Sequence, residues 1–176
     1  CINLTYVNIP DGVSEIYPNA FYGCTDLQIN KLPPSVNKVG SYAFASCKSI
    51  QTLDLPYILD MDDSVFKDCT GLTSVRILDG WYEIPSSTFS RCERLKEIIF
   101  PDSLLEIGNQ AFYGTALENV ELPLNVHTIG SEAFSGCKYL ESVDLPESIR
   151  TISSHAFADC SSLKNVSLPS KLNSIS

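Results

Sequence analysis

Apolar residues recur along the chain in one pattern that repeats from end to end. A representative stretch has Cys137, Leu140, Val143 and Leu145, followed directly by Pro146. Apolar residues two positions apart, such as Val143 and Leu145, have the periodicity of a β-strand. Because proline has no N–H to donate to a sheet, it ends the strand. Each repeat therefore predicts one short strand that stops at a turn.

The second half of each repeat has a different spacing. Val126, Ile129, Ala133 and Phe134 are three, four and one residues apart. These intervals suit a helical turn or a tight coil that returns along the back of the strand. Glycine recurs at one point of this half, where we expect a corner with a backbone conformation that is costly for other residues. These glycines are Gly40, Gly108 and Gly130.

The repeat has a fixed period of 22 or 23 residues. Seven phenylalanines lie three residues before a cysteine or before Thr115, at Phe21, Phe44, Phe66, Phe89, Phe112, Phe134 and Phe157. The cysteines are Cys1, Cys24, Cys47, Cys69, Cys92, Cys137 and Cys160. A fixed period of this length is typical of a solenoid, in which each unit buries its apolar edge by stacking on its neighbours. We therefore expect eight parallel strands that pair between repeats, with phenylalanines stacked in one row and cysteines in another.

The recurring pattern, C-x-x-L-x-x-V-x-L-P-x-x-V-x-x-I-G-x-x-A-F, resembles the leucine-rich repeats of the BspA-like, or treponemal, class. Seven of the eight units keep the proline and Leu78 replaces it in the other, the prolines being Pro10, Pro33, Pro56, Pro101, Pro123, Pro146 and Pro169. The expected fold is an α/β repeat solenoid of about eight repeats. It is an arc with a parallel β-sheet on its concave face, and short strands or helical turns on its convex side.

Three departures from the pattern predict local irregularity. Asn30 stands where the strand should have valine, so we expect a bulge near Ile29 and Asn30. One residue is missing between Pro56 and Phe66, and we expect a distorted coil over residues 60–65. A second residue is missing between Phe112 and Leu117.

Both ends of the chain fall inside a repeat, and no capping element is recognisable. Terminal units of a solenoid need a polar outer cover. We therefore expect residues 1–176 to form a single solenoid that is a fragment of a longer chain.

Composition narrows the classes of partner. The 12 Lys and Arg against 21 Asp and Glu give a formal charge of −9. This balance argues against nucleic acid and against an anionic membrane surface, both of which require basic patches. The hydrophobic fraction of 44% suffices for a sizeable core. No apolar run approaches the roughly 20 residues that span a bilayer.

The cysteines have three possible roles. We favour small buried side chains whose thiols bond weakly to the backbone, because the row tolerates Thr115 at one position. Disulfides between neighbouring repeats are a second possibility, which the common direction of stacked side chains opposes. A metal site is the third, although the chain has none of the paired C-x-x-C motifs typical of zinc.

Candidate catalytic and metal-binding residues are few. His127 and His155 occupy variable positions at different points of their repeats, so we interpret them as surface residues. Asp60, Asp62 and Asp63 resemble the start of a calcium loop, but its later glycine and glutamate are absent, which favours a solvated acidic corner. We predict no enzyme activity, no cofactor and no metal.

Alternate residues of each strand should point outward and form a broad exposed face. We expect its centre at Arg76, Glu97 and Ile99, since an exposed isoleucine beside a charged group is typical of a binding site. The candidate partner-binding residues are Tyr6, Ile29, Lys31, Thr52, Asp54, Ser74, Arg76, Glu97, Ile99, Asn119, Glu121, Ser142 and Asp144.

The family resemblance implies a cell-surface or secreted protein that binds other proteins. It implies adhesion to host extracellular-matrix or cell-surface proteins, cell contact or coaggregation. An alternative hypothesis is a structural spacer that holds another domain away from the cell.

Overall fold

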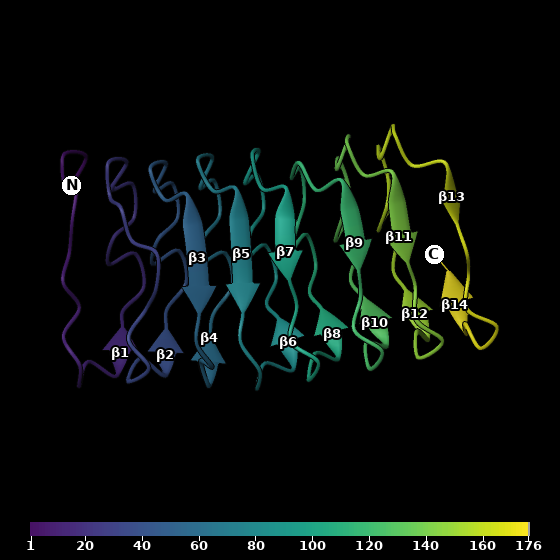
Figure 1. The fold of residues 1–176 in the computed structure, drawn as a ribbon, viewed down its shortest axis with the longest axis horizontal. Coiled ribbons are helices and arrows are strands. Elements are labelled where there is room, and N and C mark those ends of the chain that lie inside the picture. Colours follow the sequence, from purple (N-terminus) through teal and green to yellow (C-terminus); the bar gives the residue numbers. More distant parts are fainter. Residues whose placement is uncertain (176) are drawn as a thin grey trace.

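The computed structural model describes residues 1–175, and their chain winds into a stack of coils (Figure 1). We number the coils so that each ends at the cysteine position of the repeat. Coils 1 to 8 are residues 1–24, 25–47, 48–69, 70–92, 93–115, 116–137, 138–160 and 161–175. Successive coils lie side by side along the long axis, so residues about 22 or 23 apart in the sequence are spatial neighbours (Figure 1).

One side of the stack carries the longer strands, and we call it the long-strand face. Its first sheet contains β3 (Thr52–Leu55), β5 (Ser74–Ile77) and β7 (Glu97–Ile99). Its second sheet contains β9 (Asn119–Glu121), β11 (Ser142–Asp144) and β13 (Asn165–Val166). All pairs are parallel. Buried and exposed residues alternate along β3, as the spacing of the apolar residues predicts.

Each coil also has a two-residue strand after the turn that follows the long strand. One sheet contains β1 (Glu15–Ile16), β2 (Lys38–Val39) and β4 (Asp60–Met61). The other contains β6 (Glu83–Ile84), β8 (Glu106–Ile107), β10 (Thr128–Ile129), β12 (Thr151–Ile152) and β14 (Ser174–Ile175). The fold is thus a parallel β-solenoid of about seven turns.

The expected α/β class and its helical turns are wrong, because no helix occurs in residues 1–175. The segment around each phenylalanine is instead a series of tight turns. In coil 4, Ser87 and Arg91 have φ of 56° and 60°. The Phe89 N–H donates forward to the Ala111 carbonyl (2.9 Å), whereas the Ser90 N–H donates back to Ser87 (3.1 Å). In a helical turn these N–H groups would donate to carbonyls of the same coil. Here alternate N–H groups donate to carbonyls of the next coil instead.

The described residues also contain no helix that could cross a bilayer.

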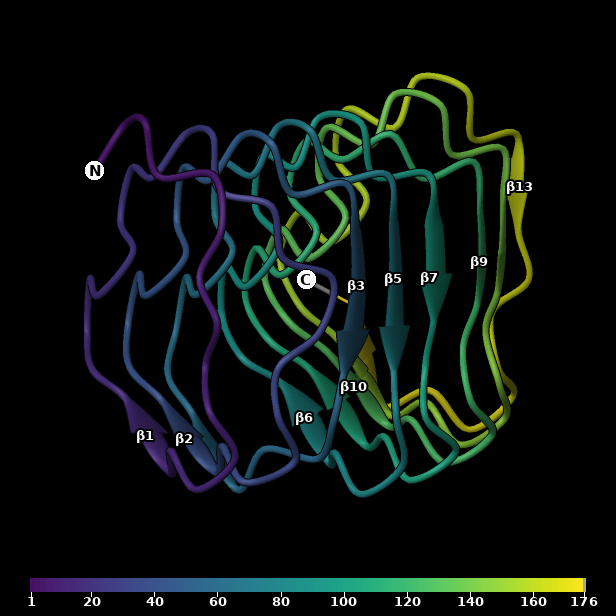
Figure 2. The same ribbon diagram turned by 60° about the vertical axis from the view of Figure 1, so that its left-hand side comes forward.

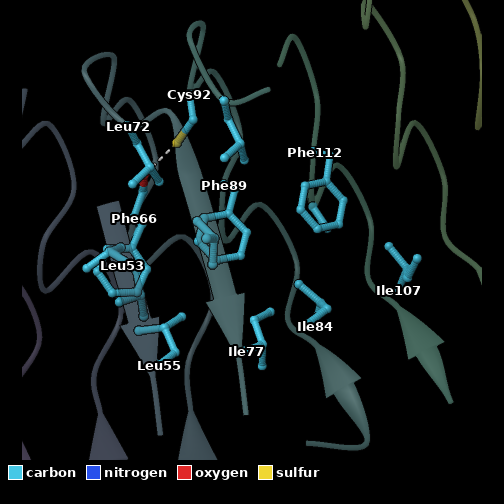
Figure 3. Packing of buried hydrophobic residues seen from close by; sticks show 14 of the residues in the cluster. Leu53, Leu55, Phe66, Leu72, Ile77, Ile84, Phe89, Cys92, Ile107 and Phe112 are labelled. Atoms are coloured by element: carbon cyan, nitrogen blue, oxygen red, sulfur yellow. Dashed lines mark hydrogen bonds between the residues drawn. The ribbon is translucent and has the colours of Figure 1, made fainter. Parts of the chain in front are cut away.

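The side chains between the two sets of strands form one continuous core (Figure 3). Phenylalanine rings from neighbouring coils stack in a row, with centroids 5.2 Å apart for Phe21 and Phe44 and 5.8 Å apart for Phe66 and Phe89. The predicted phenylalanine row is confirmed.

The predicted single sheet of eight long strands is wrong at two places. Residues 4–9 of coil 1 and 27–32 of coil 2 form no strand, apart from an isolated bridge between Lys31 and Asp54. The ladder also breaks between β7 and β9. This second break lies next to the position of the residue that is missing after Phe112. We attribute the break to the shortened coil, because its strand cannot stay in register with the neighbouring strand along its whole length.

The residue missing from coil 3 is accommodated before residues 60–65, contrary to our prediction. Asp60 and Met61 pair regularly with β2, and the chain bends at Leu59 instead. Trp81 in coil 4 occupies the position where the pattern has valine, and it is buried. Its indole N–H donates to the Pro56 carbonyl at 2.8 Å, across the shortened turn. The indole thus links coil 4 to the shortened turn of coil 3.

The recurring glycines have a different cause from the one predicted. Gly40, Gly108 and Gly130 have no left-handed backbone. A Cβ on Gly108 would instead lie 2.7 Å from the Ile84 carbonyl oxygen of coil 4. Close approach of consecutive coils therefore excludes a side chain at this corner.

Candidate protein-binding face

The register of the long strands places the outward residues in two rows across the face. One row runs through Lys31, Asp54, Arg76 and Ile99, each paired with the next in register. The other row contains Thr52, Ser74 and Glu97 in the same way. Because each row joins consecutive coils, side chains from different repeats form one surface.

Arg76 and Asp54 form the clearest polar contact on this face. The Arg76 Nε donates to Asp54 Oδ1 at 3.1 Å, and a terminal nitrogen donates to Oδ2 at 2.7 Å. This hydrogen bond and the charge of Asp54 raise the pKa of Arg76. The Asp54 carboxylate therefore holds the guanidinium group of Arg76 on the side that faces coil 3.

Ile99 lies beside Arg76 and is 60% exposed. Glu97, two residues earlier on the same strand, is exposed next to Ser74 rather than next to Arg76. The three residues of the expected centre therefore occupy two neighbouring strands. An exposed isoleucine next to an arginine held in place by Asp54 provides an apolar anchor with a fixed polar border.

The part of the face formed by coils 6 and 7 is polar and acidic. Glu121 pairs in register with Asp144, and Asn119 with Ser142, whose hydroxyl donates to the Asn119 side chain at 2.8 Å. At its border Lys96 lies 3.0 Å from Glu118, and this contact raises the pKa of Lys96.

Ile29 does not point fully outward from this face, contrary to the prediction, although it lines a groove there. It is half-buried against the core, and Asn30 is exposed. An amide at the inward position of a strand would lose water without a hydrogen-bond partner. The chain therefore bends at Asn30 and turns Ile29 inward, so the predicted irregularity falls at this position.

A groove of about 480 Å³ opens beside this bend. It lies between coils 1 and 2 and extends to Asp54 of coil 3 and Leu78 of coil 4, and it includes the predicted face residues Tyr6 and Lys31. Sequence reasoning missed this groove. Its one signal in the sequence is Asn30 at a strand position that should be apolar.

A second feature that sequence reasoning missed is an exposed apolar corner around the shortened turn of coil 3. Tyr57, Leu59 and Tyr82 are exposed and line one depression. The missing residue between Pro56 and Phe66 indicates irregularity here, but the exposure of these side chains follows from the bend at Leu59.

The cysteine thiols have the predicted burial and backbone contacts. The Cys47, Cys69 and Cys137 thiols are buried, and each donates at 3.2 Å to a phenylalanine carbonyl one coil back. All seven cysteines are unpaired thiols, with Cys1 exposed and Cys160 half-buried. Burial raises the pKa of the Cys47 thiol to about 12. Such a thiol is a poor nucleophile near neutral pH.

Both histidines are accessible to solvent. His127 Nδ1 is 3.3 Å from the Thr128 hydroxyl and 4.0 Å from a Glu106 carboxylate oxygen. His155 is exposed and has a φ of 59°, at one of the turn positions before phenylalanine.

The three aspartates of the acidic corner each have a partner in a neighbouring coil. Asp62 accepts hydrogen bonds from the Ser41 N–H and hydroxyl, at 3.1 and 3.3 Å. Asp63 accepts from the Ser86 N–H at 3.1 Å, and Asp60 lies 3.8 Å from Lys38. Across residues 1–175, no three His, Cys, Asp or Glu side chains gather in a way that could hold a metal ion. The aspartates act as links between coils.

Comparison with known families agrees with this architecture. The sequence matches the BspA type leucine rich repeat region in six copies, over residues 1–104 and 59–176. No curated protein sequence matches the chain.

Several solved structures are similar. A leucine rich cell surface protein from Faecalibacterium prausnitzii A2-165 is 30% identical, with a TM-score of 0.76 over 93% of this chain and 54% of that one. The chain thus spans about half the length of that protein. The T. pallidum leucine rich repeat protein is 33% identical, with a TM-score of 0.62 over 94% of this chain and 71% of that one. The pneumococcal vaccine antigen PcpA, at 22% identity and a TM-score of 0.59, shares the fold over 87% of this chain and 47% of its own.

Proposed function

The chain belongs to the BspA-type leucine-rich repeat family, and from this membership we propose that it is a non-catalytic module that binds proteins through its long-strand face. One observation carries the proposal: Ile99 is exposed beside an arginine that Asp54 holds in place. Arginine is enriched among the residues that contribute most to protein interfaces, and the exposed apolar surface of Ile99 beside it can be removed from water on binding. The exposed rows around it extend over consecutive coils, and protein interfaces use broad surfaces of this kind.

We further propose that the module acts in adhesion at a cell surface or outside the cell. The F. prausnitzii relative is a cell surface protein. The acidic half of the face, with Glu121 and Asp144, suits basic patches on host matrix or cell-surface proteins. Nucleic acid is not an expected partner, because the formal charge is −9.

A structural spacer is the second candidate function. The regular coil-to-coil hydrogen bonds favour it, since a continuous core gives a stiff rod that can hold another domain at a distance.

One experiment separates the two functions. An array of purified extracellular-matrix proteins and intact host or microbial cells is probed with the native chain and with a triple variant, Arg76→Ala, Glu97→Ala and Ile99→Ala. A matched variant changes the exposed residues Lys48, Glu93 and Tyr113, which lie outside the face, to alanine. Binding that is lost in the first variant and kept in the second supports a binding module. No binding by the native chain favours the spacer, and equal binding by all three proteins excludes Arg76, Glu97 and Ile99 as the binding centre.

A further inference from the structure

A groove opens on the long-strand face between coils 1 and 2. Its volume is about 480 Å³, and its walls include Tyr6 and Asn8 on one side and Asn30 and Lys31 on the other. Figure 2 shows the purple chain of coil 1 and the indigo chain of coil 2 diverging at mid-height, while the short strands β1 and β2 stay together below them. The stack is therefore opened on one face and closed on the other.

Backbone hydrogen bonding is interrupted along this groove. The Gln28 N–H donates to the Thr5 carbonyl at 2.9 Å, where coil 2 enters the face. Within the described chain, no backbone hydrogen bond joins residues 6–9 to residues 29–32 below this point. On its other side, coil 2 is held by the Asp54 N–H, which donates to the Asn30 carbonyl at 2.8 Å. Both walls of the groove thus present unpaired backbone donors and acceptors.

Unpaired backbone groups of this kind are the feature by which a sheet edge takes up an additional strand. Here two such edges face one another, and both chains run in the same direction. A strand between them can form hydrogen bonds on both sides, because successive N–H groups of a strand point to opposite neighbours. The groove is thus suited to an extended chain.

Side chains along the groove define the chemistry of its occupant. The half-buried Ile29 and the exposed Pro34 give apolar contact. Asp54 is already paired with Arg76. The Lys31 ammonium has no carboxylate within ion-pair distance among residues 1–175. A carboxylate on the occupant, at the level of Lys31, would complement this charge.

We propose that this groove binds one extended segment of a partner protein, which adds as a parallel or antiparallel strand between residues 6–9 and 29–32. The segment has alternating apolar side chains and an acidic residue facing Lys31. This inference rests on the proposed protein-binding function, but it assigns a site at the opposite end of the face from the acidic coils 6 and 7.

The first test uses synthetic probes and the full chain of 176 residues. The probe is a fluorescent eight-residue peptide of alternating valine and threonine with one central glutamate, and binding is followed by fluorescence anisotropy. A second peptide has the same side chains but N-methyl groups on alternate amides, which removes the donors along one edge. The N-methylated peptide should bind at least about tenfold more weakly, since two or more hydrogen bonds are lost. Equal binding of the two peptides would overturn the proposal.

Charge gives a further check with the same assay. A peptide with central lysine should bind about threefold to tenfold more weakly than the glutamate peptide. The variant Lys31→Glu should reverse this order. An unchanged order in the variant would show that Lys31 does not face the probe, and would contradict the assigned side-chain chemistry.

A structural test exchanges two neighbouring residues, Ile29→Asn with Asn30→Ile. The exchange keeps the composition and restores an apolar residue at the inward position of the strand, so coil 2 should pair with coil 1 and close the groove. We expect higher resistance to urea and loss of binding to the glutamate peptide. Slow exchange of the amide hydrogens of residues 6–9 would show that pairing is restored in the variant. If such a variant still binds the glutamate peptide, the groove is not the binding site.

The two proposals can fail separately. The double variant Glu97→Ala with Ile99→Ala tests the centre of the face, keeps the Arg76–Asp54 pair beside the groove, and should leave peptide binding at the groove within about twofold. If the peptide binds as expected but no matrix protein or cell does, the groove stands and the adhesion proposal fails. If matrix binding is lost in the triple variant but the peptide never binds, the face stands and the groove does not.

Discussion

The thiol of Cys92 donates a hydrogen bond to the carbonyl oxygen of Phe66, one coil back in the stack, at 3.2 Å (Figure 3). The same carbonyl accepts the N–H of Cys69 in its own coil, at 3.3 Å. The thiol therefore completes a junction between coils in addition to filling space. This explains why a small side chain with a weak donor recurs at this position.

Replacing Cys92 by alanine should lower the free energy of unfolding by about 1–2 kcal/mol. The variant loses the sulfur atom from a fully buried position and a hydrogen bond to Phe66. Urea unfolding followed by circular dichroism measures the change. Cys1→Ala serves as the control, because Cys1 is exposed and should give no measurable difference. Equal stability of both variants would mean that the thiols of the row contribute nothing.

Stability should decline at alkaline pH because of the buried thiols. Desolvation raises the pKa of Cys47 and of Cys160 to about 12. In the unfolded chain a thiol titrates near 8.5. Between these values the unfolded state binds fewer protons than the folded state, so the free energy of unfolding falls as pH rises.

We therefore expect a constant urea midpoint below about pH 8 and a falling midpoint from about pH 9 toward 12. The double variant Cys47→Ala with Cys160→Ala should show a shallower decline than the native chain. Parallel curves for the two proteins would assign the decline to other groups.

Removing the indole of Trp81 should be among the most destabilising single changes, at about 3–5 kcal/mol for alanine. Trp81 is buried and its N–H donates to the Pro56 carbonyl at 2.8 Å. Trp81→Phe keeps a ring but loses the donor, and should cost about 1–3 kcal/mol. Circular dichroism must follow unfolding, since this is the chain's single tryptophan. A loss below about 1 kcal/mol for alanine would mean that burial of the ring and its bond to Pro56 contribute little to stability.

Substitution by asparagine should have different effects on stability at two of the glycines. Gly114 has a φ of 66° and free space around it, whereas Gly108 has no positive φ and faces the Ile84 carbonyl oxygen. Alanine should destabilise the chain by about 1–3 kcal/mol at either position, through backbone strain at Gly114 and steric contact at Gly108. Asparagine tolerates the left-handed region, so it should cost less than alanine at Gly114 and at least as much at Gly108. Thermal unfolding of the four variants checks this order.

The periodic core was the most predictable part of the fold. Burial of Phe89 and Cys92 follows from their fixed spacing, because any solenoid with that period stacks them on the same residues of the next coil. The turns on the back were not predictable as such. Ala133 and Phe134 have intervals that suit both a helical turn and a series of tight turns, and apolar spacing alone does not report which carbonyl each N–H meets.

The outward residues were predictable wherever the strand kept its pattern. Arg76 and Ile99 are exposed and adjacent as the alternation of β5 and β7 predicts. Ile29 was misplaced because the alternation rule assumes a regular strand, and the cost of burying Asn30 outweighs that regularity. The groove opens beside the same bend at Asn30, and no count of apolar positions would have predicted it.

All of the coil-to-coil hydrogen bonds, including the one from Phe89 to Ala111, link one coil to the next along the stack. A force that pulls the two ends of the stack apart therefore acts along these hydrogen bonds rather than in shear across them. The junctions between coils can then separate one after another. Along the long-strand face, within the described residues, no strand pairing joins coil 1 to coil 2 or β7 to β9. Under tension the long-strand face would separate first at these two places, while the pairs β1 with β2 and β8 with β10 still hold the coils together on the other side.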